Sequence, residues 1–298
     1  MLRLSYLCDK ILSNVGKKKR EVELVILSDI HLGTYGCHAE ELLKYLKTIR
    51  AKTLVLNGDI IDMWQFSKRY WPQSHMQIVK HLTGQIARGA KVIYLTGNHD
   101  EMLRKFAGFR LGSFQILNKK VMALNGKKAW IFHGDVFDVT MQHSKWLAKL
   151  GAAGYDMLIL LNTFVNWVLK LFGREKISLS KRVKESVKQA VKFINDFERT
   201  AAEIAITKGY DYVVCGHIHH PEMREIVTDK GAVTYLNSGD WVENLTALEY
   251  NGGFWKIYRY AEDPVAQSMK IPKRFRKALD NDKIFKDLVD QFIEPPKS

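Results

Sequence analysis

The chain has 298 residues, of which 46% are apolar, and this is enough to build one large core or one domain with an insertion. Its formal net charge of +14 favours anionic partners, such as phosphorylated small molecules, acidic lipid surfaces or nucleic acid. The composition excludes a disordered, collagenous or disulfide-framed protein, because Cys8, Cys37 and Cys215 are few and widely spaced.

The first half of the sequence alternates between strand and helix patterns. Apolar runs predict strands at 22–28, 53–57 and 91–96, and amphipathic patterns predict helices at 38–50 and 74–89 between them. This alternation is typical of an α/β architecture. Further strand-like runs lie at 120–124, 128–132, 211–215, 223–227, 232–236, 244–249 and 254–260.

Between residues 140 and 208 the pattern becomes entirely helical, with one segment at 141–172 and another at 179–208. We interpret these segments as a helical hairpin that is inserted between strands as a cap. Residues 264–298 then form a basic tail that contains a helical pattern. The predicted organisation is therefore one domain over 1–263, which includes the cap, followed by this tail.

The sequence predicts neither a membrane span nor a secretory signal. The most apolar stretch, 157–172, is too short to cross a bilayer and carries Asn162, Asn166 and Lys170. The N-terminal apolar stretch is interrupted by charged residues, and its basic cluster follows it instead of preceding it. We therefore expect a cytoplasmic protein, which agrees with the absence of a disulfide pattern.

Polar side chains follow five of the predicted strands, at the point where each strand ends. They carry carboxylate, amide or imidazole groups. Because the carboxyl ends of strands line the ligand crevice of an α/β sheet, we expect these residues to converge. They are Asp29 and His31 after the first strand, Asp59 and Asp62 after the second, Asn98, His99, Asp100 and Glu101 after the third, His133 and Asp135 after 128–132, and His217, His219 and His220 after 211–215.

This set of side chains has the chemistry of a metal centre. Imidazole nitrogens combined with carboxylate and amide oxygens suit divalent ions such as Mn, Fe, Zn or Mg. The donors outnumber the ligands of one four-coordinate ion, so two ions that share a carboxylate use them better. A single Asp-x-His or Gly-Asp pair is common, whereas five such elements in this order are specific.

The five elements resemble the motifs of the calcineurin-like metallophosphoesterase superfamily over residues 22–260. The resemblance implies a two-sheet β-sandwich flanked by helices, and a hydrolase acting on phosphoester or diphosphate bonds. The superfamily pattern is DxH, GDxxD, GNH[DE], a lone His and GHxH. The chain has Asp29-Ile30-His31, Gly58-Asp59-Ile60-Ile61-Asp62, Gly97-Asn98-His99-Asp100, His133 and Gly216-His217-Ile218-His219.

The same resemblance implies a role for each residue. His99 would stabilise charge on the phosphoryl group or protonate the leaving oxygen, and Asp62 would orient it. His220 falls outside the motif, and we expect it at the surface. Two metal ions would activate water for in-line attack at phosphorus. One ion would be held by Asp29, His31, Asp59 and His219, and the other by Asp59, Asn98, His133 and His217.

A narrower resemblance links the motifs SDIHLG, GDIIDMW, HGD, GHIHHPE and NSGDWVEN, together with the cap at 140–208, to bacterial UDP-2,3-diacylglucosamine diphosphatases of lipid A biosynthesis. That family releases UMP and the lipid X monophosphate, prefers manganese and works at the inner face of the cytoplasmic membrane. The resemblance implies two manganese ions, a nucleotide-lipid substrate and peripheral contact with an anionic membrane. Its best-known members have Arg at the position of His99 and Glu at that of Asp62. This difference leaves the reaction class unchanged but bears on which substrate is hydrolysed.

Candidate substrate contacts lie near the motifs and in the cap. Asn162, Asn166 and Lys170 recur every four residues and form a polar stripe on an otherwise apolar helix. An acyl-chain groove and simple packing of the hairpin on the sheet both fit this pattern. The other candidates are Trp64, Arg69, Arg104 and Trp241, for which packing or solvation is the competing explanation.

Three further functions compete with the lipid diphosphatase. The first is a phosphodiesterase or phosphatase that acts on a soluble nucleotide or other phosphoester. The second is a nucleic-acid enzyme, prompted by the charge, but we find no helix-turn-helix, zinc finger or aromatic–basic platform. The third is a non-catalytic scaffold, which would have no use for buried carboxylates beside imidazoles.

Overall fold

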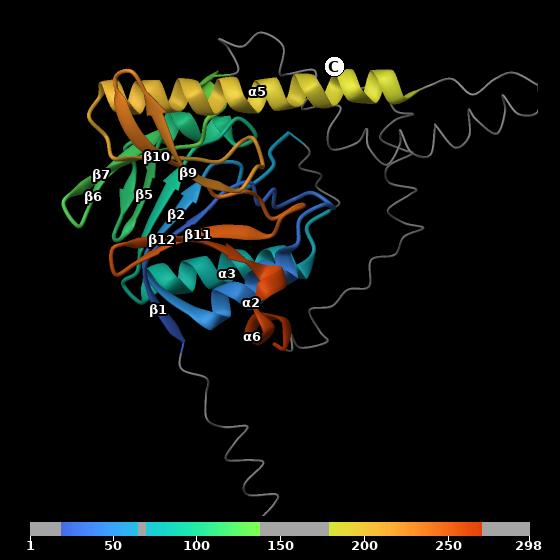
Figure 1. The fold of residues 1–298 in the computed structure, drawn as a ribbon. Helices are drawn as coiled ribbons and strands as arrows, with labels where there is room; N and C mark the ends of the chain where they lie inside the picture. The colour runs from blue at the N-terminus through green and yellow to red at the C-terminus, as the bar shows by residue number, and fades with distance from the viewer. Residues whose placement is uncertain (1–18, 65–69, 138–178, 270–298) are drawn as a thin grey trace, which may run out of the picture.

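The structure is a computed structural model, and it describes residues 19–64, 70–137 and 179–269. These residues form two mixed β-sheets packed face to face, with helices on both outer sides (Figure 1). The two-sheet α/β sandwich predicted from the sequence is confirmed.

The described strands and helices follow the expected order along the chain. The helices are α2 (Ala39–Thr48), α3 (Gln73–Ala87), α5 (Leu179–Thr207) and α6 (Pro264–Gln267), with 3-10 turns η1 (Glu101–Phe106), η2 (Asp135–Phe137) and η3 (Tyr260–Glu262). The strands are β1 (Arg20–Leu27), β2 (Ile49–Asn57), β3 (Lys91–Leu95), β4 (Arg110–Leu111), β5 (Phe114–Leu117), β6 (Lys119–Leu124), β7 (Lys127–Phe132), β8 (Tyr212–Cys215), β9 (Glu222–Thr228), β10 (Gly231–Asn237), β11 (Thr246–Asn251) and β12 (Phe254–Arg259).

Both sheets have parallel strands at their centres and antiparallel strands at their edges. The seven-stranded sheet has the order β12-β11-β1-β2-β3-β5-β4, in which β1, β2, β3 and β5 are parallel. The five-stranded sheet has the order β6-β7-β8-β10-β9, in which β7, β8 and β10 are parallel. The strands that precede the motif residues are therefore the buried central ones.

Three apolar layers explain why these central strands read as continuous apolar runs. In β1, Val25 and Leu27 pack against α2 and α3, whereas Leu24 and Ile26 face the second sheet. In the second sheet, side chains such as Val213 face α5. Strands that are buried on both faces need apolar residues at every position, instead of at alternate ones.

The structure changes some expected boundaries and adds two strands. The first helix ends at Thr48 instead of residue 50, because Ile49 and Arg50 already pair with β1. The short strands β4 and β5 have no counterpart in the prediction. The second predicted cap helix, 179–208, is observed as α5, whereas the first cap segment and most of the tail lie outside the described residues.

The tail begins with a short helix that packs on the domain. Asp263 caps α6 by accepting hydrogen bonds from the backbone of Val265 and Ala266. Ala266 is fully buried. Among the described residues, no helix is long and apolar enough to span a bilayer.

Candidate metal centre

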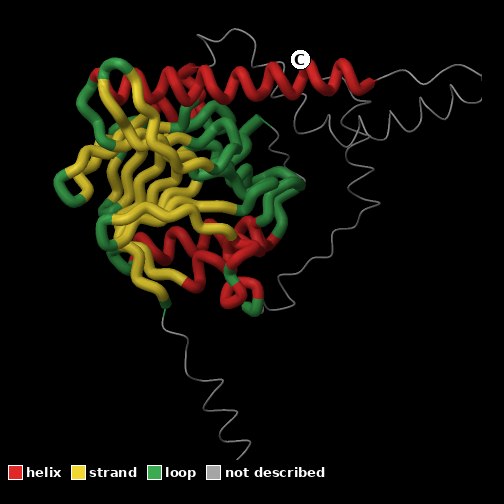
Figure 2. Tube along the Cα trace, in the orientation of Figure 1, coloured by secondary structure: helices red, strands yellow, loops and turns green. Residues whose placement is uncertain are grey.

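The strand ends bring the motif residues to one place. Asp29, Asp59 and Asn98 follow the carboxyl ends of β1, β2 and β3, which are parallel neighbours in one sheet. His133 and His217 follow β7 and β8, which are parallel neighbours in the other sheet. Figure 2 shows loops gathered along this side of both sheets, beneath α5.

The backbone of the motif loops adopts a conformation that most residues avoid. Five non-glycine residues of the motifs have a positive φ: Asp29 at 51°, His31 at 53°, Asp59 at 53°, His217 at 67° and His219 at 52°. This left-handed region costs an L-residue about 1 kcal/mol or more. Such strain is retained where the side chain has to be aimed at a particular point, and here all five aim at one centre.

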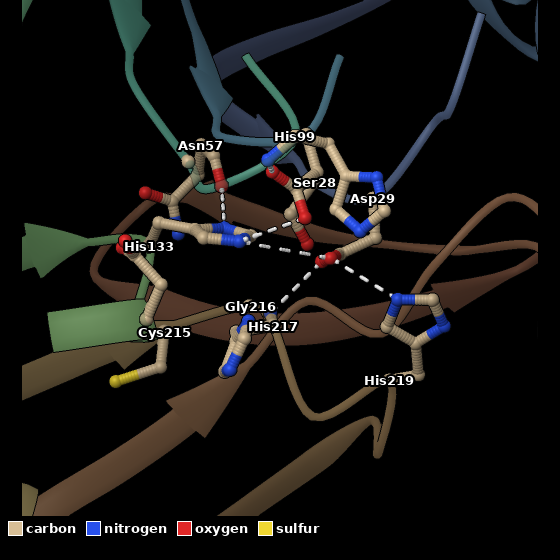
Figure 3. Close-up of polar contacts among 12 residues, drawn as sticks. Ser28, Asp29, Asn57, His99, His133, Cys215, Gly216, His217 and His219 are labelled. Atoms are coloured by element: carbon tan, nitrogen blue, oxygen red, sulfur yellow. Dashed lines mark hydrogen bonds and ion pairs between the residues drawn. The ribbon is translucent and has the colours of Figure 1, made fainter. Parts of the chain in front are cut away.

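The first cluster consists of Asp29, His31 and His219, whose donor atoms lie within 4.8 Å of one another. The Oδ1 atom of Asp29 lies 3.2 Å from Nε2 of His219. Asp29 is fully buried, and its other oxygen accepts a hydrogen bond of 3.0 Å from the backbone of His217. Figure 3 shows Asp29 between His133, His217 and His219.

The second cluster consists of Asp59, His133 and His217, with donor atoms again within 4.8 Å. Nε2 of His133 lies 3.2 Å from Asp59 Oδ2 and 4.0 Å from Asp29 Oδ1, which connects the two clusters. Asn98 lies beside them, since the next backbone NH, that of His99, donates to Asp59 Oδ1 at 2.8 Å.

Several donor atoms in these clusters have the environment that a cation requires. Asp29 Oδ1, His31 Nε2, Asn98 Oδ1 and His133 Nε2 are buried, and none has a hydrogen-bond partner among the described residues. Buried polar atoms are normally hydrogen-bonded, so four exceptions around one point are informative. Nitrogen and oxygen donors whose lone pairs converge in this way fit divalent metal ions.

Two glycines leave room for this convergence. A Cβ atom on Gly58 would lie 2.3 Å from Nδ1 of His133, and one on Gly97 would lie 2.2 Å from Oδ1 of Asp59. Any other residue at these positions would displace a donor of the second cluster. The strand exits therefore need glycine because the backbone passes directly against the side chains of the centre.

The carboxylates and imidazoles of the clusters shift each other's pKa values toward the charged forms. Burial raises the pKa of Asp29, but the imidazoles of His219 and His133 outweigh it and lower the pKa to about 2. Burial lowers the pKa of His219, but the Asp29 carboxylate outweighs it and raises the pKa to about 9. Asp59 is likewise held ionised, since His133 lowers its pKa despite burial.

Asp62 aligns two imidazoles with a single oxygen atom. Its Oδ2 lies 2.9 Å from Nδ1 of His99 and 3.1 Å from Nδ1 of His31. Its Oδ1 accepts from the backbone NH of Trp64 at 3.1 Å. Both imidazoles thus carry the proton on Nδ1 and are free to present Nε2. The sequence assigned Asp62 to His99 alone, and the contact with His31 is new.

His99 lies at the open side of the centre. Its side chain is 20% exposed, and the indole of Trp64 lies over it with ring centroids 4.3 Å apart. Burial lowers its pKa, but the Asp62 hydrogen bond and the Asp59 charge together raise it above the ordinary value. The raised pKa of His99 and its partly exposed position suit contact with an anionic group.

A family comparison agrees with this arrangement. The model of the calcineurin-like phosphoesterase family matches residues 22–221, which include all five motifs. The chain belongs to this family. As a calcineurin-like phosphoesterase, it hydrolyses phosphoester bonds with the help of divalent metal ions.

Individual relatives cover most of this phosphoesterase. A UDP-2,3-diacylglucosamine hydrolase of Aliivibrio fischeri is 21% identical over 248 residues, which are 79% of this chain and 98% of the relative. The protein of the same name from Photorhabdus laumondii is 26% identical over 249 residues, which are 78% of this chain and 94% of the relative. A solved archaeal phosphodiesterase is 15% identical and covers 79% of this chain and 98% of its own, with a TM-score of 0.40.

The structure places some of the expected substrate contacts near the centre and others away from it or outside the described residues. Trp64 is 58% exposed beside His99, and Arg104 lies nearby, where it pairs with Asp135 and donates to the Gly97 carbonyl at 3.3 Å. Trp241 is wrong as a substrate contact, because it is fully buried and stacks on the ring of Tyr45. Arg69, Asn162, Asn166 and Lys170 lie outside the described residues.

Sequence reasoning missed the carbonyl of Asn57 and gave no role to Asp100, and both position the centre. The Asn57 carbonyl accepts from Nδ1 of His133 at 2.8 Å and thereby turns Nε2 toward Asp59. Asp100 is fully buried and accepts from the backbone of Gly97 and Ile60 at 2.6 and 3.0 Å. Asp100 stood within the GNHD motif, so its position was visible in the sequence although its partners were not.

Helix α5 also reaches the metal centre, which the sequence did not indicate. Phe197 is fully buried, and its ring lies 6.3 Å from that of His217. Next to it, buried Glu198 pairs with Arg224 and lies 3.8 Å from Nδ1 of His220. His220, half exposed at the surface as expected, thus helps to join α5 to the loop that carries His217 and His219.

Proposed function

We propose that this phosphoesterase uses two metal ions to hydrolyse the diphosphate of a UDP-linked diacylated amino sugar. Water adds to one phosphorus, one P–O bond of the diphosphate breaks, and the products are UMP and a lipid-sugar monophosphate. The geometry that carries the proposal is the pair of clusters joined at Asp29, Asp59 and His133, with His99 beside them.

The residues divide between two ions in a way that the clusters support. Asp29, His31 and His219 would hold one ion, and Asn98, His133 and His217 the other, with Asp59 shared between them. The mixture of imidazole and oxygen donors suits manganese, with iron, zinc or magnesium as substitutes. Bound ions would supply Lewis-acid stabilisation of phosphoryl charge and would activate water near neutral pH.

His99 and Asp62 would handle the proton. Because Asp62 holds the proton of His99 on Nδ1, the Nε2 atom faces the open side of the centre. A protonated His99 would neutralise charge on the scissile phosphate and donate its Nε2 proton to the leaving oxygen. Asp62 would stabilise the imidazolium before transfer and retain the Nδ1 proton afterwards.

An exposed apolar segment next to the centre supports a lipid-like substrate. Four large apolar side chains in residues 102–111 are exposed, from 48% for Phe109 to 66% for Leu111. Exposed Lys105 and Arg110 lie among them. Apolar and basic side chains in one short segment match an anionic membrane surface, and η1 begins two residues after His99.

The departure at His99 and Asp62 favours a second candidate of the same reaction class. This is a phosphodiesterase for a soluble nucleotide or other phosphoester, for which acyl chains would be unnecessary. The discriminating experiment incubates manganese-loaded protein with UDP-2,3-diacylglucosamine, UDP-N-acetylglucosamine and bis-p-nitrophenyl phosphate, with Asp59→Ala as the inactive control.

The lipid proposal predicts that UMP is released from the acylated substrate at least about 100-fold more efficiently than from its soluble counterpart. Comparable efficiency on the two UDP-sugars would contradict the lipid assignment and support the soluble-substrate alternative. Absence of turnover on all three substrates would contradict both candidates.

A further inference from the structure

A concave basic surface lies between α2 and α3, away from the metal centre. It is a groove of about 220 Å³ between Lys47 of α2 and Lys80, His81, Gly84 and Arg88 on the α3 side. Figure 1 shows α2 and α3 side by side against the seven-stranded sheet, opposite α5. Lys19 does not line the groove but lies near it, because it directly precedes β1 and its charge interacts with those of Arg88 and Lys47.

The groove and the metal centre lie at opposite ends of the same strands. Strand β2 begins at Ile49, beside the groove, and ends at Asn57, directly before the Asp59 loop. Its nine residues span about 25–30 Å at roughly 3.3 Å per residue. A ligand in the groove is therefore separate from a substrate at His99.

The cations that line the groove, and the neighbouring Lys19, lack acidic partners. Within the described part of the chain, Lys19, Lys47, Lys80 and Arg88 form no ion pair with a carboxylate. The pKa of Lys19 is lowered by partial burial and then by Arg88, Arg50 and Lys47, which shows that these cations lie within range of one another. Uncompensated cations that converge on a concave surface form an electrostatic site for an anion.

Interaction with a helix dipole accounts for only two of these four cations. Lys47 lies in the last turn of α2 and Arg88 at the C-cap of α3, where cations complement the helix dipole. Lys80 lies in the middle of α3, and Lys19 lies in no helix. The charges of Lys80 and Lys19 are therefore not stabilised by a helix dipole, and they repel those of Lys47 and Arg88.

The groove also has a fixed, uncharged wall. Nε2 of His81 lies 3.1 Å from the side-chain nitrogen of Gln85, and the imidazole also hydrogen-bonds the backbone of Leu46. Burial, and then Lys19 and the other cations, lower the pKa of His81 to about 4, so the ring is neutral at pH 7. The guanidinium of Arg88 lies over Gly84, where a Cβ atom would be 3.4 Å from Nη1.

We propose that this groove is a second anion site, which binds the phosphate group of a soluble phosphoester or of a phospholipid headgroup. A guanidinium offers paired donors to phosphate oxygens, and lysine ammonium groups add charge around them. The ligand neutralises the convergent cations and ties α2 to α3. The site is independent of the proposed reaction at the metal centre.

Lysine footprinting tests the proposal on the full metal-loaded chain. The protein is briefly acetylated with or without methylphosphonate, a phosphate-sized anion that the centre cannot hydrolyse, and each lysine is quantified by mass spectrometry. We expect acetylation of Lys47 and Lys80 to fall at least about threefold. Exposed Lys128 and Lys230, at the second sheet, serve as internal controls and should not change.

Two variants separate a built site from general charge screening. Arg88→Gln should abolish the protection of Lys47 and Lys80, whereas Lys230→Gln, with the same loss of charge, should retain it. Sodium chloride at equal ionic strength should protect neither lysine. Asp59→Ala, checked for folding by circular dichroism, should retain the protection, so a failure of the proposed enzymatic function remains distinguishable.

Vesicles identify the source of the phosphate. Protection by phosphatidylcholine vesicles that contain phosphatidic acid, without protection by methylphosphonate, assigns the site to a lipid headgroup. Protection by methylphosphonate assigns it to a soluble phosphoester. Equal changes at Lys80 and Lys230, or no protection by either probe, would overturn the proposal.

Discussion

Asp62 holds His31 and His99 through one oxygen atom, and its other oxygen accepts from the Trp64 backbone. Asp62→Asn replaces one of the two carboxylate oxygens by an NH₂ group. Whichever way the amide is turned, this NH₂ group would face an N–H donor, either the imidazoles or the Trp64 backbone. We expect metal affinity and turnover each to fall about 10- to 100-fold, as measured by metal titration and by phosphodiester hydrolysis. The exposed neighbour Glu101→Gln is the matched control, and wild-type behaviour of Asp62→Asn would refute the shared role.

Substitutions of His99 and of Asp59 should have different effects on metal content and turnover when both are measured on the same protein. His99→Ala removes the group that we propose faces the phosphate, so turnover should fall about 10²- to 10⁴-fold with nearly unchanged metal content. Asp59→Ala removes the donor that we propose is shared by both ions, and the protein should lose one or both of them. If His99→Ala strips the metal instead, the division between ligands and catalytic groups is wrong.

His75 makes stability depend on pH at a residue outside the metal centre. It is buried, Nδ1 accepts from the Gly33 backbone at 3.0 Å, and burial lowers its pKa to about 4. Because the unfolded chain binds this proton near pH 6.5, stability is fully present above that pH. It is lost as the pH falls toward 4, by up to about 3 kcal/mol.

His75→Asn tests this dependence, because its amide oxygen can still accept from Gly33 but does not titrate. Urea unfolding from pH 7 to pH 4 should show a smaller loss of stability in the variant than in the parent chain. Identical pH profiles for the two proteins would exclude His75 as the source.

At the scale of secondary-structure elements, the turn after β3 tolerates only glycine at position 97, because the backbone there packs directly against Asp59. Gly97 has no positive φ, so alanine would suffer only from the approach of its Cβ to Asp59. We expect Gly97→Ala to cost about 1–3 kcal/mol and to lower metal affinity, as measured by thermal melting and metal titration. Gly84→Ala, the same change within α3, should be neutral or stabilising because helices favour alanine.

Elements with a strong period or a long apolar run could be predicted, and others could not. β8 and the second half of β1, from Leu24 to Leu27, are buried on both faces, so both form continuous apolar runs. β4 and β5 have only two and four residues, and they are held as strands by pairing with each other and with β3. Such strands depend on partners that the local sequence does not identify.

At the scale of the whole molecule, metal ions should stabilise the fold. The donors come from both sheets and meet only in the native chain, so binding favours the folded state. At about 1,000 times the dissociation constant this gives about 4 kcal/mol, which raises the melting temperature by roughly 10 °C. Calorimetry of chelated and manganese-loaded protein measures the shift, and Asp59→Ala should show a much smaller one.

The convergence of these side chains could be predicted from the sequence because each of them follows a central strand. Parallel strands place their ends together, so Asp59 and Asn98 had to be neighbours once the sheet order was known. The contributions of Phe197 and the basic groove depend on how α5, α2 and α3 pack, and similar charges on an unpaired helix would face solvent. Trp241 was misjudged because a tryptophan beside a motif looks the same in sequence whether it faces the pocket or the core.

The single oxygen between His31 and His99 has a consequence for changing this enzyme. A substitution at Asp62 that changes the hold on one imidazole also shifts the other, so the roles proposed for His31 in metal binding and for His99 in proton transfer cannot be adjusted one at a time. A redesign that replaces His99 by a permanently charged side chain places that charge against the oxygen that also holds His31, so the position of His31 has to be checked in the same step.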